Sequence, residues 1–323
     1  MKRDLLSISD LSFDEIAVLI KNTFILKEKQ KKLVKYQPLV GKSLGMLFQK
    51  PSTRTSISFA VGMYQLGGFP IMLSSRDLQL QRGESISDTG RVVERYLDLL
   101  MIRANKHSEA VGLSQNSSVP VINGLTDKEH PCQVLADVFT LIEKLSKSKK
   151  DFKEKLTKGV FNTLKVSFIG DSNNVANSWI LASAVLGMNF VIACPIGFEP
   201  DKQIIALAQD LSAKSGAKID ITNDPKEAVK DSNIVYTDVW VSMGKEAEQE
   251  KRKSTFKDFQ VNEKLMADAL PDTLVMHCLP AKRGEEITAG VIDGPQSVIF
   301  DQAENRLHMQ KAILLALSGI WEI

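Results

Sequence analysis

The amino-acid sequence predicts an α/β fold with two doubly wound, parallel-sheet domains. Three observations lead to this prediction. The chain has 323 residues, about twice the length of an average domain. Its composition, 43% hydrophobic and 25% charged, is ordinary for a globular protein. Short apolar runs alternate with segments of helical length, which is the pattern that right-handed βαβ units produce.

The first half of the chain contains four apolar runs separated by helix-like segments. Strands are expected at residues 44–48, 70–73, 99–103 and 119–123. Helices are expected at residues 55–66, 87–96 and 107–113, and from Pro131 past Leu141. A lysine-rich stretch, 144–158, then interrupts the alternation, so we place the domain boundary there, between domains at 1–145 and 146–323.

The alternation resumes after this stretch. Strands are expected at residues 164–169, 190–194, 218–221, 234–236, 273–277 and 298–300. Helices are expected at residues 175–187, at 201–215 with Gly216 as the C-terminal cap, from Pro225, and at 305–317. Ligands of such domains bind at the carboxyl ends of the strands.

Charge and cysteine usage exclude several classes of protein. The chain carries 41 Lys and Arg against 39 Asp and Glu, so no overall field favours nucleic acid or an anionic membrane. Two lysine clusters, 27–35 and 144–158, are interpreted as solvated helical faces. The three cysteines, Cys132, Cys194 and Cys278, form no CxxC pair and predict neither a disulfide framework nor a zinc site.

Location is predicted from the same features. Reduced thiols indicate a cytoplasmic protein, and the N-terminal residues lack the apolar core of a signal peptide. Residues 175–198 carry no charge and are long enough to span a bilayer. They also contain Asn177, Ser178, Gly187, Asn189 and Pro195, so we interpret them as a buried helix followed by a strand.

The segment Ser52-Thr53-Arg54-Thr55 follows a predicted strand and opens a predicted helix. Hydroxyl groups, free amides at a helix start and a guanidinium group together can bind a phosphate. The alternative is an ordinary capped helix with a surface arginine. Two nucleotide motifs are excluded: residues 41–43 resemble the end of a P-loop that lacks its first glycine, and residues 170–174 lack the later glycines of a dinucleotide site.

Other polar residues stand where predicted strands or loops meet helices. Arg103 ends an apolar strand, and the segment 130–133 (His-Pro-Cys-Gln) opens a helix. Asp238 and the segment 277–280 (His-Cys-Leu-Pro) follow later strands, and Arg306 begins the terminal helix. Because parallel strands end at one edge of a sheet, we expect these residues in a cleft. The alternatives are a solvated loop histidine at His130 and a core thiol at Cys278.

Four motifs occur in order: Ser-Thr-Arg-Thr from Ser52, His-Pro-Cys-Gln from His130, Asp-x-x-x-Ser-Met-Gly from Asp238 and His-Cys-Leu-Pro from His277. Together they make the chain resemble the aspartate/ornithine carbamoyltransferase superfamily, in particular its ornithine branch. Residues 63–68 and 304–306 are also similar to the family. One departure is Ser56, where the family usually has arginine; we interpret the loss as a missing helix or domain contact.

The resemblance implies transfer of a carbamoyl group from carbamoyl phosphate to the δ-amine of L-ornithine, without metal or organic cofactor. The alternatives are transfer to another amine and a catalytically silent relative. It implies a homotrimer or a multiple of trimers, a role in arginine biosynthesis, and a last helix, about 305–319, that packs back toward the first domain.

The resemblance also implies three sets of site residues. The implied carbamoyl phosphate-binding residues are Ser52, Thr53, Arg54, Thr55, Gln79, Arg103, His130, Pro131, Cys132, Gln133, Cys278, Leu279 and Arg306, with Gln79 lent to a neighbouring subunit. The implied ornithine-binding residues are Asn174, Asp238, Ser242 and Met243. The implied catalytic residues are Arg54, Arg103, His130, Asp238, Cys278 and Arg306.

Overall fold

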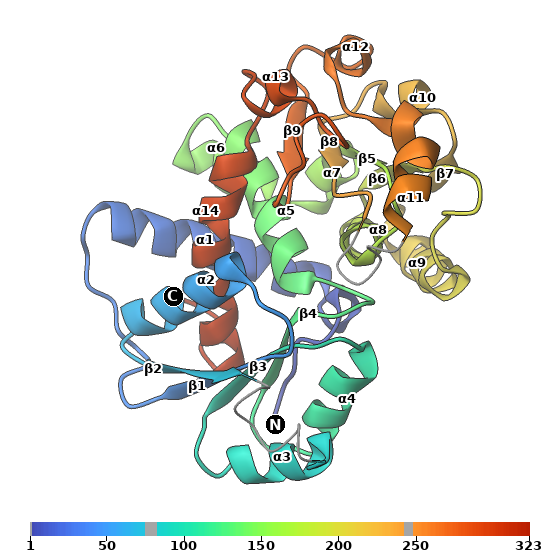
Figure 1. Cartoon of the computed structure of the whole chain (residues 1–323). Coiled ribbons are helices and arrows are strands. Elements are labelled where there is room, and N and C mark those ends of the chain that lie inside the picture. The colour runs from blue at the N-terminus through green and yellow to red at the C-terminus, as the bar shows by residue number, and fades with distance from the viewer. Residues whose placement is uncertain (1, 75–82, 242–247) are drawn as a thin grey trace. The chain divides into compact units, whose positions relative to one another are not determined.

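The computed structural model divides the chain into two compact units, each with its own parallel sheet (Figure 1). It describes residues 2–74, 83–241 and 248–323. The first unit consists of Met1–Phe139 and Glu304–Ile323, and the second of Thr140–Ala303. The first unit is therefore assembled from two separate stretches of chain, and the last helix belongs to it, as expected.

The sheet of the first unit has four parallel strands in the order β2-β1-β3-β4. Their bounds are β1 Ser43–Phe48, β2 Phe69–Ser74, β3 Leu99–Arg103 and β4 Val121–Leu125. Phe48, the last residue of β1, pairs with Ser74 of β2 and with Arg103 of β3, and Arg103 pairs with Leu125 of β4. The carboxyl ends of all four strands therefore lie at one edge.

Side-chain caps fix where the helices of this unit begin. Their bounds are α1 Phe13–Lys31, α2 Thr53–Gln65, α3 Ile86–Val93, α4 His107–Gln115, α5 Pro131–Leu145 and α14 Ile299–Leu317. Ser12 forms a capping box with Glu15 at the start of α1, and Ser52 caps α2. Among the expected elements, only the helical face at 27–35 overlaps α1. Lys27, expected on a solvated face, is instead buried in α1.

The N-terminal segment covers the free edge of this sheet. Leu5 forms a parallel bridge with Ile122 of the edge strand β4. The Leu5 amide donates to the Val121 carbonyl at 2.9 Å, and the Asn123 amide donates to the Leu5 carbonyl at 2.8 Å. Backbone groups of β4 on that side are thereby hydrogen-bonded.

The second unit contains five parallel strands in the order β7-β6-β5-β8-β9. Their bounds are β5 Lys165–Ile169, β6 Asn189–Ala193, β7 Ile219–Thr222, β8 Ile234–Thr237 and β9 Leu274–His277. The strand expected at 298–300 is wrong, because only Ser297 bridges to Val275 and α14 begins at Ile299. The other expected strands fall within two residues of observed ones.

The helices of the second unit connect its strands. They are α6 Lys149–Lys155, α7 Lys158–Phe161, α8 Asn174–Leu186, α9 Lys202–Ser215, α10 Pro225–Val229, α11 Gln249–Phe256, α12 Glu263–Met266 and α13 Ala289–Ile292. Gly187 and Gly216 end α8 and α9 with φ of 82° and 83°, which glycine adopts without steric penalty. The uncharged segment 175–198 is the buried helix α8 followed by β6, as predicted. Within the described residues, no helix is both long and apolar enough to cross a membrane.

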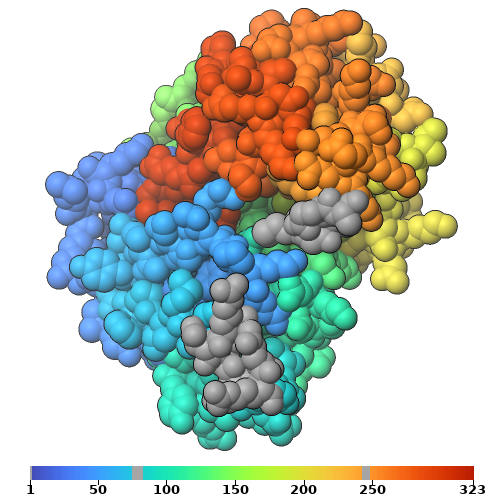
Figure 2. All heavy atoms as spheres, in the orientation of Figure 1, coloured from blue at the N-terminus to red at the C-terminus, as the bar shows by residue number. Residues whose placement is uncertain are grey.

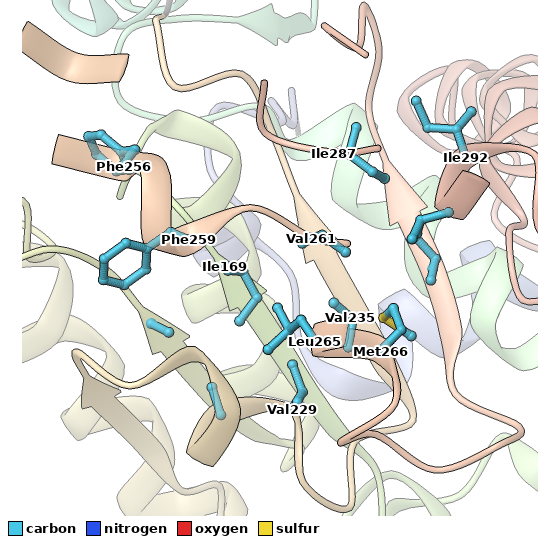
Figure 3. Close-up of a cluster of buried hydrophobic side chains, with 14 of the residues drawn as sticks. Ile169, Val229, Val235, Phe256, Phe259, Val261, Leu265, Met266, Ile287 and Ile292 are labelled. Atoms are coloured by element: carbon cyan, nitrogen blue, oxygen red, sulfur yellow. The ribbon is translucent and has the colours of Figure 1, made fainter. Parts of the chain in front are cut away.

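A hydrophobic cluster anchors the strands β5 and β8 to the later part of the second unit (Figure 3). Ile169 and Val235 come from these strands, and Phe256 comes from the end of α11. The ring of Phe256 also stacks on Trp240, with centroids 6.1 Å apart. The chain is therefore fixed by packing on both sides of residues 242–247.

Candidate functional site

The start of α2 presents the first group of candidate residues. Ser52 follows the loop after β1, and its Oγ accepts a hydrogen bond from the Thr55 amide at 3.2 Å. This cap fixes the first turn of α2, which carries Thr53 and Arg54. The Oγ of Ser56 donates to the Thr53 carbonyl at 3.1 Å, so this unusual serine bonds within its own helix.

His130 is buried in the first unit, and three arginines lie near enough to act on its charge. Burial lowers the pKa of His130 well below 6.5, and the positive charges of Arg306, Arg103 and Arg54 lower it further. Three guanidinium groups from three different elements thus act on one neutral imidazole. A cluster of this kind is suited to a dianionic ligand such as a phosphate ester or anhydride.

Arg306 joins the beginnings of two helices within the first unit. Its guanidinium donates to Gln133 Oε1 at 2.5 Å and to Thr55 Oγ1 at 3.0 Å. Gln133 in turn donates from Nε2 to Asp137 Oδ1 at 2.8 Å. The start of α2, the start of α5 and the terminal helix α14 therefore meet through one side chain that is only 2% exposed.

Pro131 opens α5, and the buried Cys132 follows it. Burial raises the pKa of the Cys132 thiol to about 12, so this cysteine stays protonated near neutral pH. Its Sγ donates to the Asn123 carbonyl of β4 at 3.4 Å. The side chain of Cys132 therefore connects α5 to the sheet and does not act as a nucleophile.

Glu129, which precedes His130, is a buried carboxylate that the sequence does not single out. Its Oε2 accepts from the Ile8 amide at 3.1 Å, and burial raises its pKa from 4.5 to about 7. Because folding raises this pKa, the protonated carboxyl group contributes to the stability of the folded chain. This contribution is fully present below about pH 4.5 and is lost as the pH rises through about 7.

We therefore expect Glu129→Gln to stabilise the protein in a pH-dependent way. At pH 8 the variant should exceed the parent chain in unfolding free energy by up to about 3 kcal/mol, because it removes a buried charge. Near pH 4.5 the two should be equal. Urea unfolding at both pH values measures this, with the exposed Glu322→Gln as control. The same difference at both pH values would contradict the explanation.

In the second unit, Asp238 and Cys278 lie together at the carboxyl ends of β8 and β9. Cys278 Sγ donates to Asp238 Oδ1 at 3.1 Å. Asn173 Nδ2 donates to the other carboxylate oxygen at 2.7 Å. Asp238 is buried, whereas Cys278 is half-buried. The Val239 amide also donates to Oδ1, at 2.8 Å. A carboxylate oriented by three donors suits a cationic ligand group.

Asp238, His277 and Cys278 are the one set of three potential metal ligands found in the described part of the chain; their ligand atoms lie within 4.8 Å of one another. However, His277 Nδ1 accepts from the Leu279 amide at 2.9 Å, and Nε2 lies 3.1 Å from Glu286 Oε1. Both ring nitrogens are thus engaged, so a metal would have to displace one of these contacts. Leu279 itself has φ 58°, which non-glycine residues rarely adopt.

Asn174, an implied ornithine-binding residue, is the first residue of α8. The preceding Asn173 caps this helix through Oδ1, which accepts from the Val175 and Ala176 amides. Asn173 therefore caps α8 and also orients the Asp238 carboxylate. The sequence did not identify this residue, although an asparagine between a strand and a helix is a recognisable cap.

Arg252 of α11 is another residue that the sequence did not identify. Its guanidinium donates to Asp171 Oδ2 and to the Trp240 carbonyl, both at 2.9 Å, and lies 5.0 Å from the Phe198 ring centroid. The contacts join α11 to the turn after β5 and to the chain before residue 242. Ser242 and Met243, which the sequence singles out, lie outside the described residues, as does Gln79 of the first unit.

Two clusters thus emerge, each at the carboxyl ends of its own sheet. The first unit brings together Thr55, His130, Gln133 and the three arginines. The second brings together Asp238 and Cys278, with Asn174 at the start of a neighbouring helix.

Comparison with known proteins matches both units. Residues 3–143 match the family model "Aspartate/ornithine carbamoyltransferase, carbamoyl-P binding domain", and residues 162–317 match "Aspartate/ornithine carbamoyltransferase, Asp/Orn binding domain". An ornithine carbamoyltransferase from Syntrophus aciditrophicus is 51% identical over 97% of this chain and 99% of its own. One from Methanosarcina mazei is 52% identical over 98% and 99%.

Solved structures show the same similarity. The ornithine carbamoyltransferase from Pyrococcus furiosus superposes with a TM-score of 0.91 at 48% identity, over 98% of this chain and 97% of that one. The anabolic ornithine carbamoyltransferase from Campylobacter jejuni has a TM-score of 0.89 at 39% identity, over 98% and 99%.

Proposed function

This chain belongs to the aspartate/ornithine carbamoyltransferase family, and on that premise we propose how its two clusters divide the reaction. The chain transfers the carbamoyl group of carbamoyl phosphate to the δ-amine of L-ornithine, giving L-citrulline and phosphate. This division of the reaction is supported by what each unit contains. In the first unit three arginines act on the charge of His130, and in the second Cys278 donates to Asp238.

The first unit, which includes Arg306, is proposed to bind carbamoyl phosphate. Arg54 and the amides at the start of α2 would hold the phosphate, and Arg306 would neutralise its charge as it departs. The other proposed contacts are Ser52, Thr53, Thr55, Pro131, Cys132 and Gln133, with Cys278 and Leu279 from the second domain.

Polarisation of the carbamoyl carbonyl is assigned to Arg103, His130 and Thr55. Attack by the amine places negative charge on this oxygen, and donors oriented in advance stabilise it. Because the pKa of His130 is held well below 6.5, the imidazole is neutral and has one N–H to donate. The proposed mechanism uses no metal and no organic cofactor.

The second unit is proposed to bind ornithine through Asn174, Asp238, Ser242 and Met243. An alkylammonium has a pKa near 10.4, so about one molecule in a thousand carries a free amine near neutral pH. Asp238 would hold the ammonium form, and the neighbouring Cys278 would help provide the environment in which the proton leaves. The cytoplasm and arginine biosynthesis are the proposed setting.

A competition assay tests the acceptor. Citrulline or its analogue is measured colorimetrically with ornithine, putrescine, N-acetylornithine or aspartate as the amine. Activity that favours ornithine supports the proposal. Preference for another amine would move the chain to a different carbamoyl transfer, and inactivity with all four would indicate a catalytically silent relative.

Cys278→Ser tests the amine-side environment. For the parent chain, we expect kcat/KM for ornithine to rise between about pH 6 and 8.5, as an amine-side group loses its proton. His130 does not contribute, because its pKa lies well below 6.5. The variant should shift this profile or raise the ornithine KM, whereas Cys194→Ser, which changes a buried thiol outside both clusters, should do neither. An unchanged profile and KM would make Cys278 a structural residue.

A homotrimer, or a multiple of trimers, is proposed as the working assembly. Its support is a set of exposed apolar side chains on α2 and β2, the light blue elements of Figure 2. Four large hydrophobic side chains there are each more than half exposed: Ile57, Tyr64, Phe69 and Met72. Single exposed hydrophobics are common, but a group on one edge strand and its adjoining helix suits a second copy of the chain.

In such a trimer, Gln79 is proposed to reach the neighbour's phosphate. Arg54→Ala and Gln79→Ala proteins should each be nearly inactive. After mild dissociation and mixing, hybrid trimers would join an intact Arg54 to an intact Gln79 from the next chain, and activity should return to about one native site per hybrid. Hybrids that form without regaining activity would show that each site lies within one chain.

A further inference from the structure

α1 places a buried lysine beside the part of α14 that carries Arg306. Lys27 is 4% exposed, and its Nζ donates to Asn305 Oδ1 at 2.7 Å. The ammonium group also lies 3.9 Å from Glu304 Oε2 and 5.9 Å from the ring centroid of Phe139. All of these residues belong to the first unit, where Figure 1 shows α1 beside α14.

Burying a lysine at this position costs free energy. Removing an ammonium group from water is unfavourable, and an apolar side chain of similar length would pack α1 against α14 without that penalty. The specific 2.7 Å contact with an amide oxygen is what the lysine adds. A directional contact fixes geometry in a way that apolar packing does not.

We propose that Lys27 is a positioning residue for Arg306. Asn305 and Arg306 are consecutive residues of α14, so their side chains leave the helix about 100° apart. Asn305 contacts Lys27 on α1, while Arg306 contacts Gln133 on α5 and Thr55 on α2. By holding Asn305, Lys27 fixes the rotation of α14 that brings the Arg306 guanidinium to both partners.

This inference rests on the role proposed above for Arg306 in neutralising the departing phosphate. Misplacing such a group by about 1 Å can cost on the order of 10²-fold in rate, so a small rotation of α14 would be visible in kcat. Substrate binding that depends on other residues would change less.

The same helix pair offers a matched control. Lys311 of α14 is 3% exposed, and its Nζ donates to Gln30 Oε1 at 2.7 Å and to Gln65 Oε1 at 2.9 Å. Like Lys27, it is a buried ammonium group that donates to an amide oxygen of another helix, here Gln30 of α1 and Gln65 of α2. It lies about one and a half turns beyond Arg306, away from the residues that Arg306 contacts.

The experiment compares Lys27→Met with Lys311→Met at saturating concentrations of both substrates, well below the Tm of each variant. Lys27→Met should lower kcat about 10-fold or more with little change in the ornithine KM, and Lys311→Met should keep kcat within about twofold. Lys27→Arg keeps a charged donor and should recover part of the loss. If Lys27→Met does not fold, Lys27→Gln breaks the same contact with a polar side chain.

A double-mutant cycle tests whether Lys27 acts through Arg306. In an Arg306→Ala background, Lys27→Met should lower kcat no further, because the group that it positions is gone. A crystal structure of Lys27→Met should show that Arg306 no longer donates to both Gln133 and Thr55. The positioning role is overturned if Lys27→Met and Lys311→Met have the same kcat, if the losses add in the cycle, or if both Arg306 contacts persist. A parent chain that forms no citrulline would instead overturn the proposed function, and the crystal structure would still decide the contact geometry.

Discussion

Arg54→Ala is expected to lower kcat by on the order of 10²-fold or more. Arg54 lies in the first turn of α2, and its charge is one of three that depress the pKa of His130. In the proposed mechanism its guanidinium meets the phosphate as negative charge develops there. Alanine removes that donor from the half-buried start of α2. Citrulline formation at saturating carbamoyl phosphate and ornithine measures the loss.

Ser56→Ala is the matched control for Arg54→Ala. Ser56 lies in the same part of α2, and its hydroxyl bonds to the Thr53 carbonyl within the helix. We expect kcat of this variant to stay close to that of the parent chain. His130→Ala should resemble Arg54→Ala. A normal kcat with only a higher KM for carbamoyl phosphate would mean that Arg54 binds the substrate but does not stabilise the transition state.

Asp238→Asn is expected to lower kcat/KM for ornithine by on the order of 10²-fold, which is typical when one member of a buried charged pair is removed. The carboxylate accepts from Asn173 and Cys278, which orient it. Asparagine keeps the size of the side chain but removes the negative charge proposed to hold the ammonium group.

Steady-state kinetics with each substrate varied in turn separates this effect from a general loss. The KM for carbamoyl phosphate should change little, because Asp238 is not among the proposed carbamoyl phosphate contacts. Asp220→Asn, on the exposed face of β7, makes the same chemical change outside the cluster and should leave all constants near their original values. An Asp238→Asn protein with an unchanged ornithine KM and kcat would exclude this role for the carboxylate.

The strands were predictable where the sequence contains a continuous run of apolar residues, which is typical of a buried strand. β3, for example, is five consecutive buried residues, and its apolar run ends at Arg103 as expected. The beginning of α14 was not predictable, because Val298, Ile299 and Phe300 form an apolar run that is typical of a strand. Tertiary contacts decide the outcome there, since Val298 bonds to Val275 and the helix starts at the next residue.

The candidate site was predictable where its residues lie in short contiguous motifs. Ser52–Thr55 and the helix start at Pro131 are such segments, because a helix start places several donors within one turn. Lys27, Asn173 and Arg252 were not predictable in the same way. Each has a partner that is distant in sequence, respectively Asn305, Asp238 and Asp171. Neither periodicity nor local composition records such a pairing.

The pairing of Leu5 with β4 has a consequence for solubility. A strand at the edge of a sheet has amides and carbonyls without hydrogen-bond partners, and these can pair with a strand of another molecule. Such edges promote aggregation. Here the amide of Asn123 and the carbonyl of Val121 are already bonded to Leu5. The segment around Leu5 thus protects β4 from pairing with a strand of another molecule. Fusions or truncations that displace this segment would expose the hydrogen-bonding groups of β4 and promote aggregation.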